Sequence, residues 1–302
     1  MRWKGRRQSQ HVEDRRGTQP SGARGGGALG SLLFMLFRSG NTKVRLLLIG
    51  GILVAVFVFN INPLSLLSTS GGGGAGVQVQ TSGAPPDPGT REYLATMLGD
   101  NETVWSEILA REGYQFRPAK MVIYTERTNT PAGIADAGMG PFYMPANETI
   151  YIDPSFFREM KERFGATGDF AEAYVIAHEV GHHIQNILGY SNKVHRMQAR
   201  VSKTEANQLS VRLELHADFL AGVFAHHGEE KFGFLESGDI EEAMRCAQAI
   251  GDDRLQKMSS GRIQPDLFTH GTSAQRARWF NRGLHSGQLA DGDTFTIPYE
   301  DL

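Results

Sequence analysis

Two histidines four residues apart most constrain how this chain of 302 residues can fold. They belong to the run HEVGH at 178–182, inside a stretch, 169–188, whose apolar spacing predicts one helix. On a helix His178 and His182 lie on one face, so both imidazoles can reach the same ion. Glu179 is rotated by about 100° around the axis and can reach a water at that ion without binding the ion. The run therefore predicts a zinc site that hydrolyses a substrate.

A second pair of polar residues has the same spacing further along the chain. Glu214 and Asp218 are four residues apart in a helix predicted over 204–227. Glu214 is the candidate for the third protein ligand, and Asp218 for a carboxylate that orients a ligating histidine from behind. The alternative is a pair of solvated acids. Their apolar neighbours argue against full exposure, namely Leu213, Leu215, Phe219, Leu220 and Val223.

The remaining histidines are weaker candidates. His270 precedes the last predicted helix and could polarise a substrate carbonyl or hold an oxyanion, with capping or a structural hydrogen bond as the alternative. His216 points away from Glu214, and His183 is expected to pack or face solvent. His226 and His227, near the end of a predicted helix, are expected to interact with its C-terminal dipole.

Charge and hydropathy divide the chain. Residues 1–45 hold ten Lys and Arg against two acidic residues, although the formal net charge of the chain is −2. Their Arg, Gly, Ser and Gln content predicts a largely disordered segment. The apolar run 46–61, which leucines extend to 67, predicts one transmembrane helix; a cleaved signal peptide and a buried core helix are the alternatives. Basic residues flank only its N-terminal side, which predicts a cytoplasmic 1–45 and, in a bacterium, a periplasmic domain anchored to the inner membrane.

The rest of the chain reads as a linker and one domain. Residues 68–89 are rich in Gly, Ser and Pro and predict a flexible linker before a folded domain at 90–302. A nucleic-acid-binding tail at 1–45 is the less favoured reading, because topology signals and lipid head groups explain the same charges. The single cysteine, Cys246, excludes an internal disulfide and is expected to be a small buried residue. The oligomeric state stays open.

Strands are expected before residue 155 and helices after it, which predicts an α+β fold, mostly helical with a small sheet. The strand candidates are 121–125 and 149–153, with a Gly-rich loop at 132–143 between them. The helix candidates are 90–111 with a break near Asp100-Asn101, a short helix opened by Asp153-Pro154-Ser155, 169–188 capped by Asp169 and ended by Gly189, 204–227, 239–250 and 272–283.

Several motifs in order make the sequence resemble a known family. They are HEVGHHIQ, RLELHADFLAG, IGDDRLQ at 250–256 and HGTSAQRARWF at 270–280, with MRWKGRRQSQHVEDRRG at the start. Together they resemble the putative neutral zinc metallopeptidase family of bacteria over nearly the whole chain and, more distantly, the thermolysin-like gluzincins. The chain departs from the family's ELQADC-type segment at His216 and Phe219, where Gln and Cys are expected.

The resemblance implies a zincin-type fold, in which a small twisted sheet covers the HExxH helix. It also implies that an edge strand, here from the region 138–152, pairs with an extended substrate peptide. The roles that it carries over are the binding of one zinc ion by His178, His182 and Glu214, base catalysis by Glu179, and orientation of a ligand by Asp218.

The function expected from these features is hydrolysis of peptide bonds by a membrane-anchored zinc peptidase, an endopeptidase rather than an exopeptidase. Zinc and one further donor, His270 or a tyrosine such as Tyr143, would stabilise the oxyanion. The expected partner is a peptide or protein substrate, with no nucleic acid. Two alternatives remain: a non-catalytic, zinc-stabilised binding or scaffold protein of the envelope, and a zinc hydrolase of a non-peptide amide. The presence of Glu179 between the ligands argues against the first.

Overall fold

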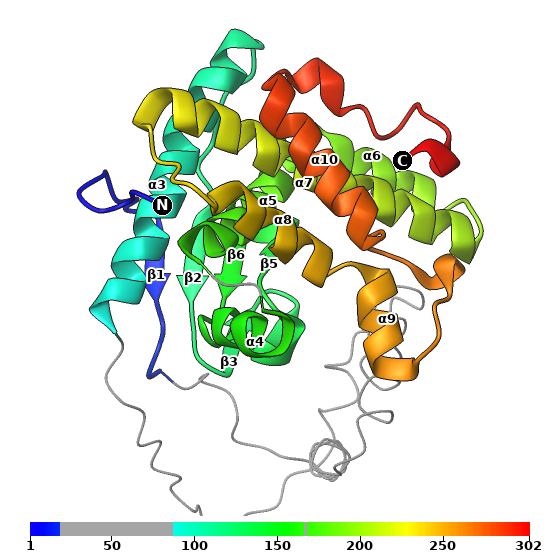
Figure 1. The fold of residues 1–302 in the computed structure, drawn as a ribbon, viewed down its shortest axis with the longest axis horizontal. Helices are drawn as coiled ribbons and strands as arrows, with labels where there is room; N and C mark the ends of the chain where they lie inside the picture. The colour runs from blue at the N-terminus through cyan, green and yellow to red at the C-terminus, as the bar shows by residue number, and fades with distance from the viewer. Residues whose placement is uncertain (19–86, 166–167) are drawn as a thin grey trace, which may run out of the picture.

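A small mixed sheet lies against a larger group of helices (Figure 1). The structure is a computed structural model and describes residues 1–18, 87–165 and 168–302. The main sheet has the strand order β1-β2-β6-β5, with β1, β2 and β6 parallel and β5 antiparallel to β6. A separate antiparallel hairpin is formed by β3 and β4. The strands are β1 (Val12–Asp14), β2 (Lys120–Ile123), β3 (Arg127–Thr130), β4 (Gly133–Asp136), β5 (Phe142–Met144) and β6 (Thr149–Ile152).

The helices follow the strands in sequence, except for α3. They are α3 (Pro88–Arg111), α4 (Ser155–Phe164), α5 (Asp169–Ile187), α6 (Tyr190–Gln198), α7 (Lys203–Phe232), α8 (Asp239–Ala249), α9 (Asp252–Ser260) and α10 (Ser273–Ser286). This order confirms the predicted α+β class, mostly helical with a small sheet.

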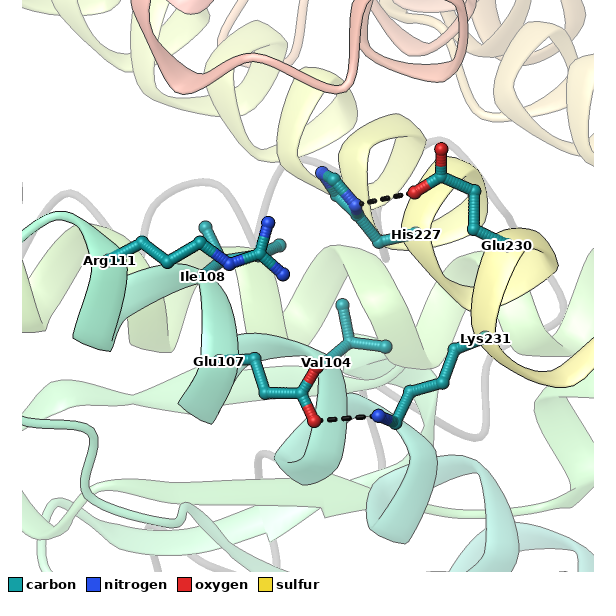
Figure 2. Close-up of a pocket in the computed structure, with 7 residues that line it drawn as sticks. All are labelled: Val104, Glu107, Ile108, Arg111, His227, Glu230 and Lys231. Carbon is teal, nitrogen blue, oxygen red and sulfur yellow. Dashed lines mark hydrogen bonds and ion pairs between the residues drawn. The ribbon is translucent and has the colours of Figure 1, made fainter.

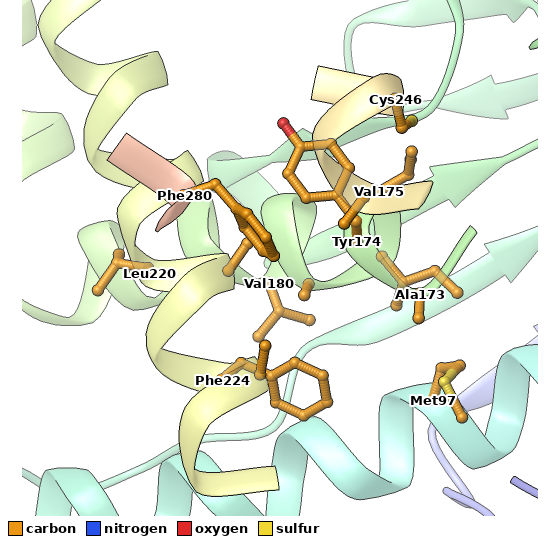
Figure 3. Close-up of a cluster of buried hydrophobic side chains, with 14 of the residues drawn as sticks. Met97, Ala173, Tyr174, Val175, Val180, Leu220, Phe224, Cys246 and Phe280 are labelled. Atoms are coloured by element: carbon orange, nitrogen blue, oxygen red, sulfur yellow. The ribbon is translucent and has the colours of Figure 1, made fainter. Parts of the chain in front are cut away.

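One hydrophobic core joins α5, α7 and α10 with α3 and α8 (Figure 3). Tyr174 of α5, Phe224 of α7 and Phe280 of α10 are each at most 1% exposed and lie at its centre. Tyr174 and Phe280 make an edge-to-face contact with ring centroids 5.3 Å apart. Cys246 lies at the α8 side of this core, which confirms that it is a small buried residue.

Glycines allow the central helices to approach closely. A Cβ atom at Gly222 of α7 would lie 2.1 Å from the carbonyl oxygen of Phe280, and one at Gly283 of α10 would lie 2.0 Å from that of Phe219. A Cβ at Gly181 of α5 would lie 3.0 Å from the carbonyl oxygen of Ala217 on α7. The space beside Gly181 is therefore taken by the backbone of α7.

The first 18 residues correct the prediction of a largely disordered N-terminal segment. Strand β1 pairs with β2 in the central sheet, with Val12 opposite Met121. The terminal ammonium lies 3.1 Å from Glu236 and 3.4 Å from Asp239, at the start of α8. Backbone hydrogen bonds and buried ion pairs thus fix a segment whose polar composition alone indicated disorder.

This packing also bears on the predicted topology. Arg16 Nη2 donates to the carbonyl oxygen of Asp87 at 3.1 Å, so the end of the described N-terminal segment lies beside the residue that precedes α3. A single membrane crossing between them would separate β1 from β2. This strand pairing and the expected single crossing therefore make opposite predictions for the side of the membrane on which residues 1–18 lie.

In the described residues no helix is long and apolar enough to span a membrane. The expected anchor at 46–67, and the linker up to residue 86, lie outside the described residues. The last part of the expected linker belongs to α3, because the Asp87 carboxylate accepts hydrogen bonds from the backbone of Gly89 and Thr90 as its N-cap.

Three local predictions were wrong. Helix α3 runs through Asp100-Asn101 without a break, because Asp100 is buried there and lies 2.7 Å from the guanidinium of Arg6. The expected loop 132–143 contains β4 and the start of β5. Helix α5 is preceded by Gly168 as its N-cap residue, so Asp169 is its first residue rather than its cap.

Candidate metal centre

Helices α5 and α7 bring three predicted ligands together. His178 Nε2 lies 3.2 Å from Glu214 Oε2, and His182 Nε2 lies 3.4 Å from Glu214 Oε1. One ligand atom from each of the three residues falls within 4.8 Å of the others. Tetrahedral bonds of about 2.0–2.2 Å place ligand atoms roughly 3.4 Å apart. The three side chains therefore have a spacing that could hold one zinc ion.

The second nitrogen of each imidazole has a hydrogen-bond acceptor. His178 Nδ1 lies 2.8 Å from Asp218 Oδ1, which is fully buried. His182 Nδ1 lies 3.0 Å from Gln185 Oε1, and the amide nitrogen of Gln185 donates to the carbonyl oxygen of Leu213 at 2.6 Å. Both imidazoles therefore carry their proton on Nδ1 and turn Nε2 toward Glu214. The two nitrogen lone pairs and the carboxylate all attract positive charge, so a cation between them would be stabilised.

Asp218 is held by more than the histidine. Arg276 donates to both of its oxygens, from Nε to Oδ2 at 2.8 Å and from Nη2 to Oδ1 at 2.9 Å. The Tyr174 hydroxyl donates to Oδ1 at 2.5 Å. Asp218, Arg276 and Tyr174 come from α7, α10 and α5, so the three helices that cross closely also fix the orientation of His178.

The charges in this cluster shift its pKa values. Burial alone would lower the pKa of His178, but the charge of Asp218 and the bonds to Asp218 and Glu214 raise it to about 10. Burial would raise the pKa of Glu214, but His182 and His270 hold it well below its usual range. The cluster therefore favours positive charge between the imidazoles and Glu214, which either protons or a metal ion can supply.

Glu179 lies beside these residues on α5 and is 7% exposed. Within residues 1–18, 87–165 and 168–302, no hydrogen bond joins its side chain to another residue, whereas Asp218 and Glu214 are both engaged. A carboxylate next to the ligands and without a protein partner can accept a proton from a water molecule.

His270 is fixed by Asp252, the first residue of α9. Asp252 Oδ2 accepts hydrogen bonds from the backbone nitrogens of Thr269, His270 and Gly271 at 2.6–3.1 Å, and Oδ1 lies 3.3 Å from His270 Nδ1. The imidazole is half-exposed, and its charge reaches Glu214. In the part of the chain that the structure describes, the hydrogen bonds of this imidazole involve Nδ1 and none involves Nε2.

Tyr143 does not suit the role of oxyanion donor. Its hydroxyl lies 2.9 Å from His183 Nδ1 and accepts a hydrogen bond from Asn186 Nδ2 at 3.2 Å. Because His183 Nε2 donates to the carbonyl oxygen of Arg117, His183 Nδ1 must accept from the tyrosine. The hydroxyl proton is already committed, and His183 has the packing role that was expected for it.

Two other expectations concern the surroundings of the site. Strand β5, from the expected region, lies at the edge of the sheet. His216 is buried on the side of α7 away from Glu214, where burial lowers its pKa to about 4, and it stacks on Phe219. The two departures from the family's ELQADC-type segment therefore lie against each other, and His216 Nδ1 also lies 3.4 Å from Nε2 of Gln185, which holds His182.

Sequence reasoning missed four residues that orient the cluster: Tyr174, Gln185, Asp252 and Arg276. Arg276 and Asp252 stand in the motifs HGTSAQRARWF and IGDDRLQ, so a signal was present. Neither motif has metal-ligand spacing, and only the close helix crossing shows which side chains they approach.

The chain matches a family of known proteins over nearly its whole length. Residues 1–295 match the family described as "Putative neutral zinc metallopeptidase". The uncharacterized protein YpfJ of Escherichia coli K12 is 43% identical over 295 residues, which are 98% of this chain and 99% of that protein. The uncharacterized protein Rv2575 of Mycobacterium tuberculosis H37Rv is 39% identical over 205 residues, 65% of this chain and 67% of that protein. No solved structure shows significant similarity to this chain. The chain belongs to the putative neutral zinc metallopeptidase family.

Proposed function

We propose that this protein is a zinc-dependent endopeptidase whose single catalytic zinc ion is held by His178, His182 and Glu214. The observation that carries the proposal is the pair of Nε2 atoms that face the Glu214 carboxylate, each fixed by an acceptor at Nδ1. Two imidazoles and one carboxylate are the donor set of many catalytic zinc sites, which keep a fourth position open.

A zinc ion bound there would polarise the substrate carbonyl and lower the pKa of water toward about 7. Glu179 takes the proton from the attacking water and passes it to the leaving amine. Its position beside His178 on α5, and the lack of a side-chain partner in the described part of the chain, support this role.

His270 donates a hydrogen bond from Nε2 to the developing oxyanion in this proposal. Three backbone hydrogen bonds to Asp252 fix the loop that carries it, so the imidazole needs little reordering when substrate binds. Tyr143 is left out because its hydroxyl proton is used by His183.

Strand β5 supports an extended peptide as substrate. Among the described strands it pairs only with β6, and Tyr143 on this strand contacts α5 through His183 and Asn186. A peptide can add to such an edge as a further strand through backbone hydrogen bonds. Binding of this kind needs no free terminus, which favours cleavage of internal bonds.

The test is a library of long peptides with acetylated N-termini and amidated C-termini, incubated with the zinc-loaded protein and read by mass spectrometry. An endopeptidase cleaves these peptides, and a zinc chelator stops the cleavage. Glu179→Gln should keep its zinc and lower kcat/KM by at least about 100-fold. Cleavage that is unchanged in Glu179→Gln would refute the role of the base. Stable zinc binding without any cleavage would favour the non-catalytic scaffold instead.

A further inference from the structure

A second cluster of two histidines and one glutamate lies on α7, about three turns beyond Glu214 of the candidate metal centre. It consists of His226, His227 and Glu230, and one ligand atom from each falls within 4.8 Å of the others. Sequence alone suggested only an interaction of these histidines with the C-terminal dipole of their own helix.

The acceptors of these imidazoles belong to a different helix. His226 Nδ1 lies 2.8 Å from the carbonyl oxygen of Leu284, and His227 Nε2 lies 2.9 Å from that of Gly287. Both carbonyl groups are at the C-terminal end of α10. A carbonyl oxygen can only accept, so His226 carries a proton on Nδ1 and His227 carries one on Nε2.

The other nitrogen of each ring faces Glu230. His226 Nε2 lies 3.4 Å from Glu230 Oε1, and His227 Nδ1 lies 3.1 Å from Oε2. In the candidate catalytic centre the matching nitrogen-to-carboxylate distances are 3.2 and 3.4 Å. In both clusters each imidazole bonds an acceptor at one nitrogen and turns the other to a shared glutamate, which is the usual arrangement of metal-binding histidines.

The surroundings decide which kind of cation fits. The cluster borders a hollow of about 170 Å³ lined also by Glu107, Arg111 and Lys231 (Figure 2). Lys231 is paired with Glu107 at 2.6 Å, and Arg111 reaches toward His227. The charges are balanced rather than acidic, so nothing here favours calcium or magnesium, which take oxygen ligands. Two imidazoles favour zinc or a similar transition metal, and the hollow has room for water at the open positions.

We propose that His226, His227 and Glu230 form a second, non-catalytic binding site for Zn²⁺ or a similar divalent transition metal. The ion joins the C-terminal end of α7 to that of α10 through the carbonyl groups that orient its ligands. These are the helices that carry Glu214, Asp218 and Arg276, so the second ion stabilises the junction on which the first centre depends.

The test is a count of zinc per full-length chain by mass spectrometry, after loading and dialysis against zinc-free buffer. The wild type should retain two ions, and His226→Gln/His227→Gln should retain one. His178→Gln/His182→Gln should also retain one, at the second site. His195→Gln changes an exposed histidine of α6 and is the matched control, which should retain two. If His226→Gln/His227→Gln retains as many ions as this control, the second site is refuted.

Glu230→Gln is a second variant in case the double variant does not fold. The Glu230 side chain is 63% exposed and does not pack in the core, so this change should leave the fold intact. It should weaken the second zinc at least 10-fold and leave the first unchanged, as judged by titration with a chelator. An unchanged second affinity would overturn the proposal. Failure of the catalytic assignment would appear separately, as a His178→Gln/His182→Gln variant that retains as many ions as the wild type.

Discussion

The guanidinium of Arg276 holds Asp218 through two hydrogen bonds that a lysine cannot make together. Arg276→Lys keeps the positive charge but cannot donate to both Asp218 oxygens at once. Asp218, and with it His178, therefore loses its fixed orientation. We expect the zinc affinity to fall about 10- to 100-fold, with a lower kcat and a nearly unchanged KM for peptide. The measurement is chelator competition combined with steady-state kinetics.

Arg278→Lys is the control for this change, because Arg278 is exposed on the same helix. It should leave the zinc affinity within error of the wild type. Equal affinities in Arg276→Lys and the wild type would mean that the buried pair only packs the core and does not orient a ligand.

At this scale the sequence predicts residues that share a helix. His178, His182 and Glu179 follow from a spacing of one turn, and Glu214 and Asp218 follow from the same rule. Arg276 lies against His178 although the two residues are 98 positions apart in the sequence. The spacing of residues within one helix cannot predict such a contact. Tyr143 was predicted as an oxyanion donor, but its hydroxyl donates its proton to His183, which lies 40 positions away in the sequence.

Gly222 sets the distance between α7 and α10. A Cβ there would lie 2.1 Å from the carbonyl oxygen of Phe280 and 2.6 Å from the amide nitrogen of Leu284, and neither backbone atom can move without moving α10. We expect Gly222→Ala to lower the free energy of unfolding by about 1–3 kcal/mol. The zinc affinity should fall as well, because the shift of α10 separates Arg276 from Asp218.

Urea unfolding and chelator titration measure the two effects. Gly89→Ala, in the first turn of α3, is the control, since a Cβ there meets only ordinary contacts with Asp87. A Gly222→Ala variant as stable as Gly89→Ala would show that the crossing tolerates a methyl group, contrary to the packing described here.

At the scale of elements, most helices were predicted close to their bounds because apolar residues at helical spacing meet the core. The short helices α6 and α9 were not predicted. Strand β4 lies in the Gly-rich stretch 132–143 that was predicted as a loop, and β3 was not predicted, because both strands are only four residues long and β3 is polar throughout. The break expected at Asp100-Asn101 followed from helix propensity alone. Tertiary contact overrides propensity there, because Arg6 lies against Asp100 from a segment 94 positions earlier.

For the whole molecule, the pairing of β1 with β2 makes a prediction about membrane topology. Residues 1–18 and 87–302 form one folded unit, so both must lie on the same side of any membrane. Single cysteines at the exposed positions Gln8 and Gln288, in a Cys246→Ala background, can be labelled in intact cells with an impermeant maleimide. Both should be labelled, or both protected.

Labelling of Gln288→Cys with protection of Gln8→Cys would restore the single crossing that hydropathy and flanking charge indicate. Those signals describe residues 46–67 well as an apolar run, but they carry no information on where residues 1–18 fold. Disorder was predicted for that part because ionic and backbone contacts, rather than a hydrophobic stripe, hold it.

The central claim is that His178, His182 and Glu214 hold a zinc ion. Its most direct test is anomalous diffraction, recorded above and below the zinc absorption edge from crystals of the zinc-loaded protein. We expect a peak within about 2.0–2.2 Å of His178 Nε2, His182 Nε2 and a Glu214 carboxylate oxygen. A zinc-loaded crystal with no anomalous peak between these three side chains would contradict it.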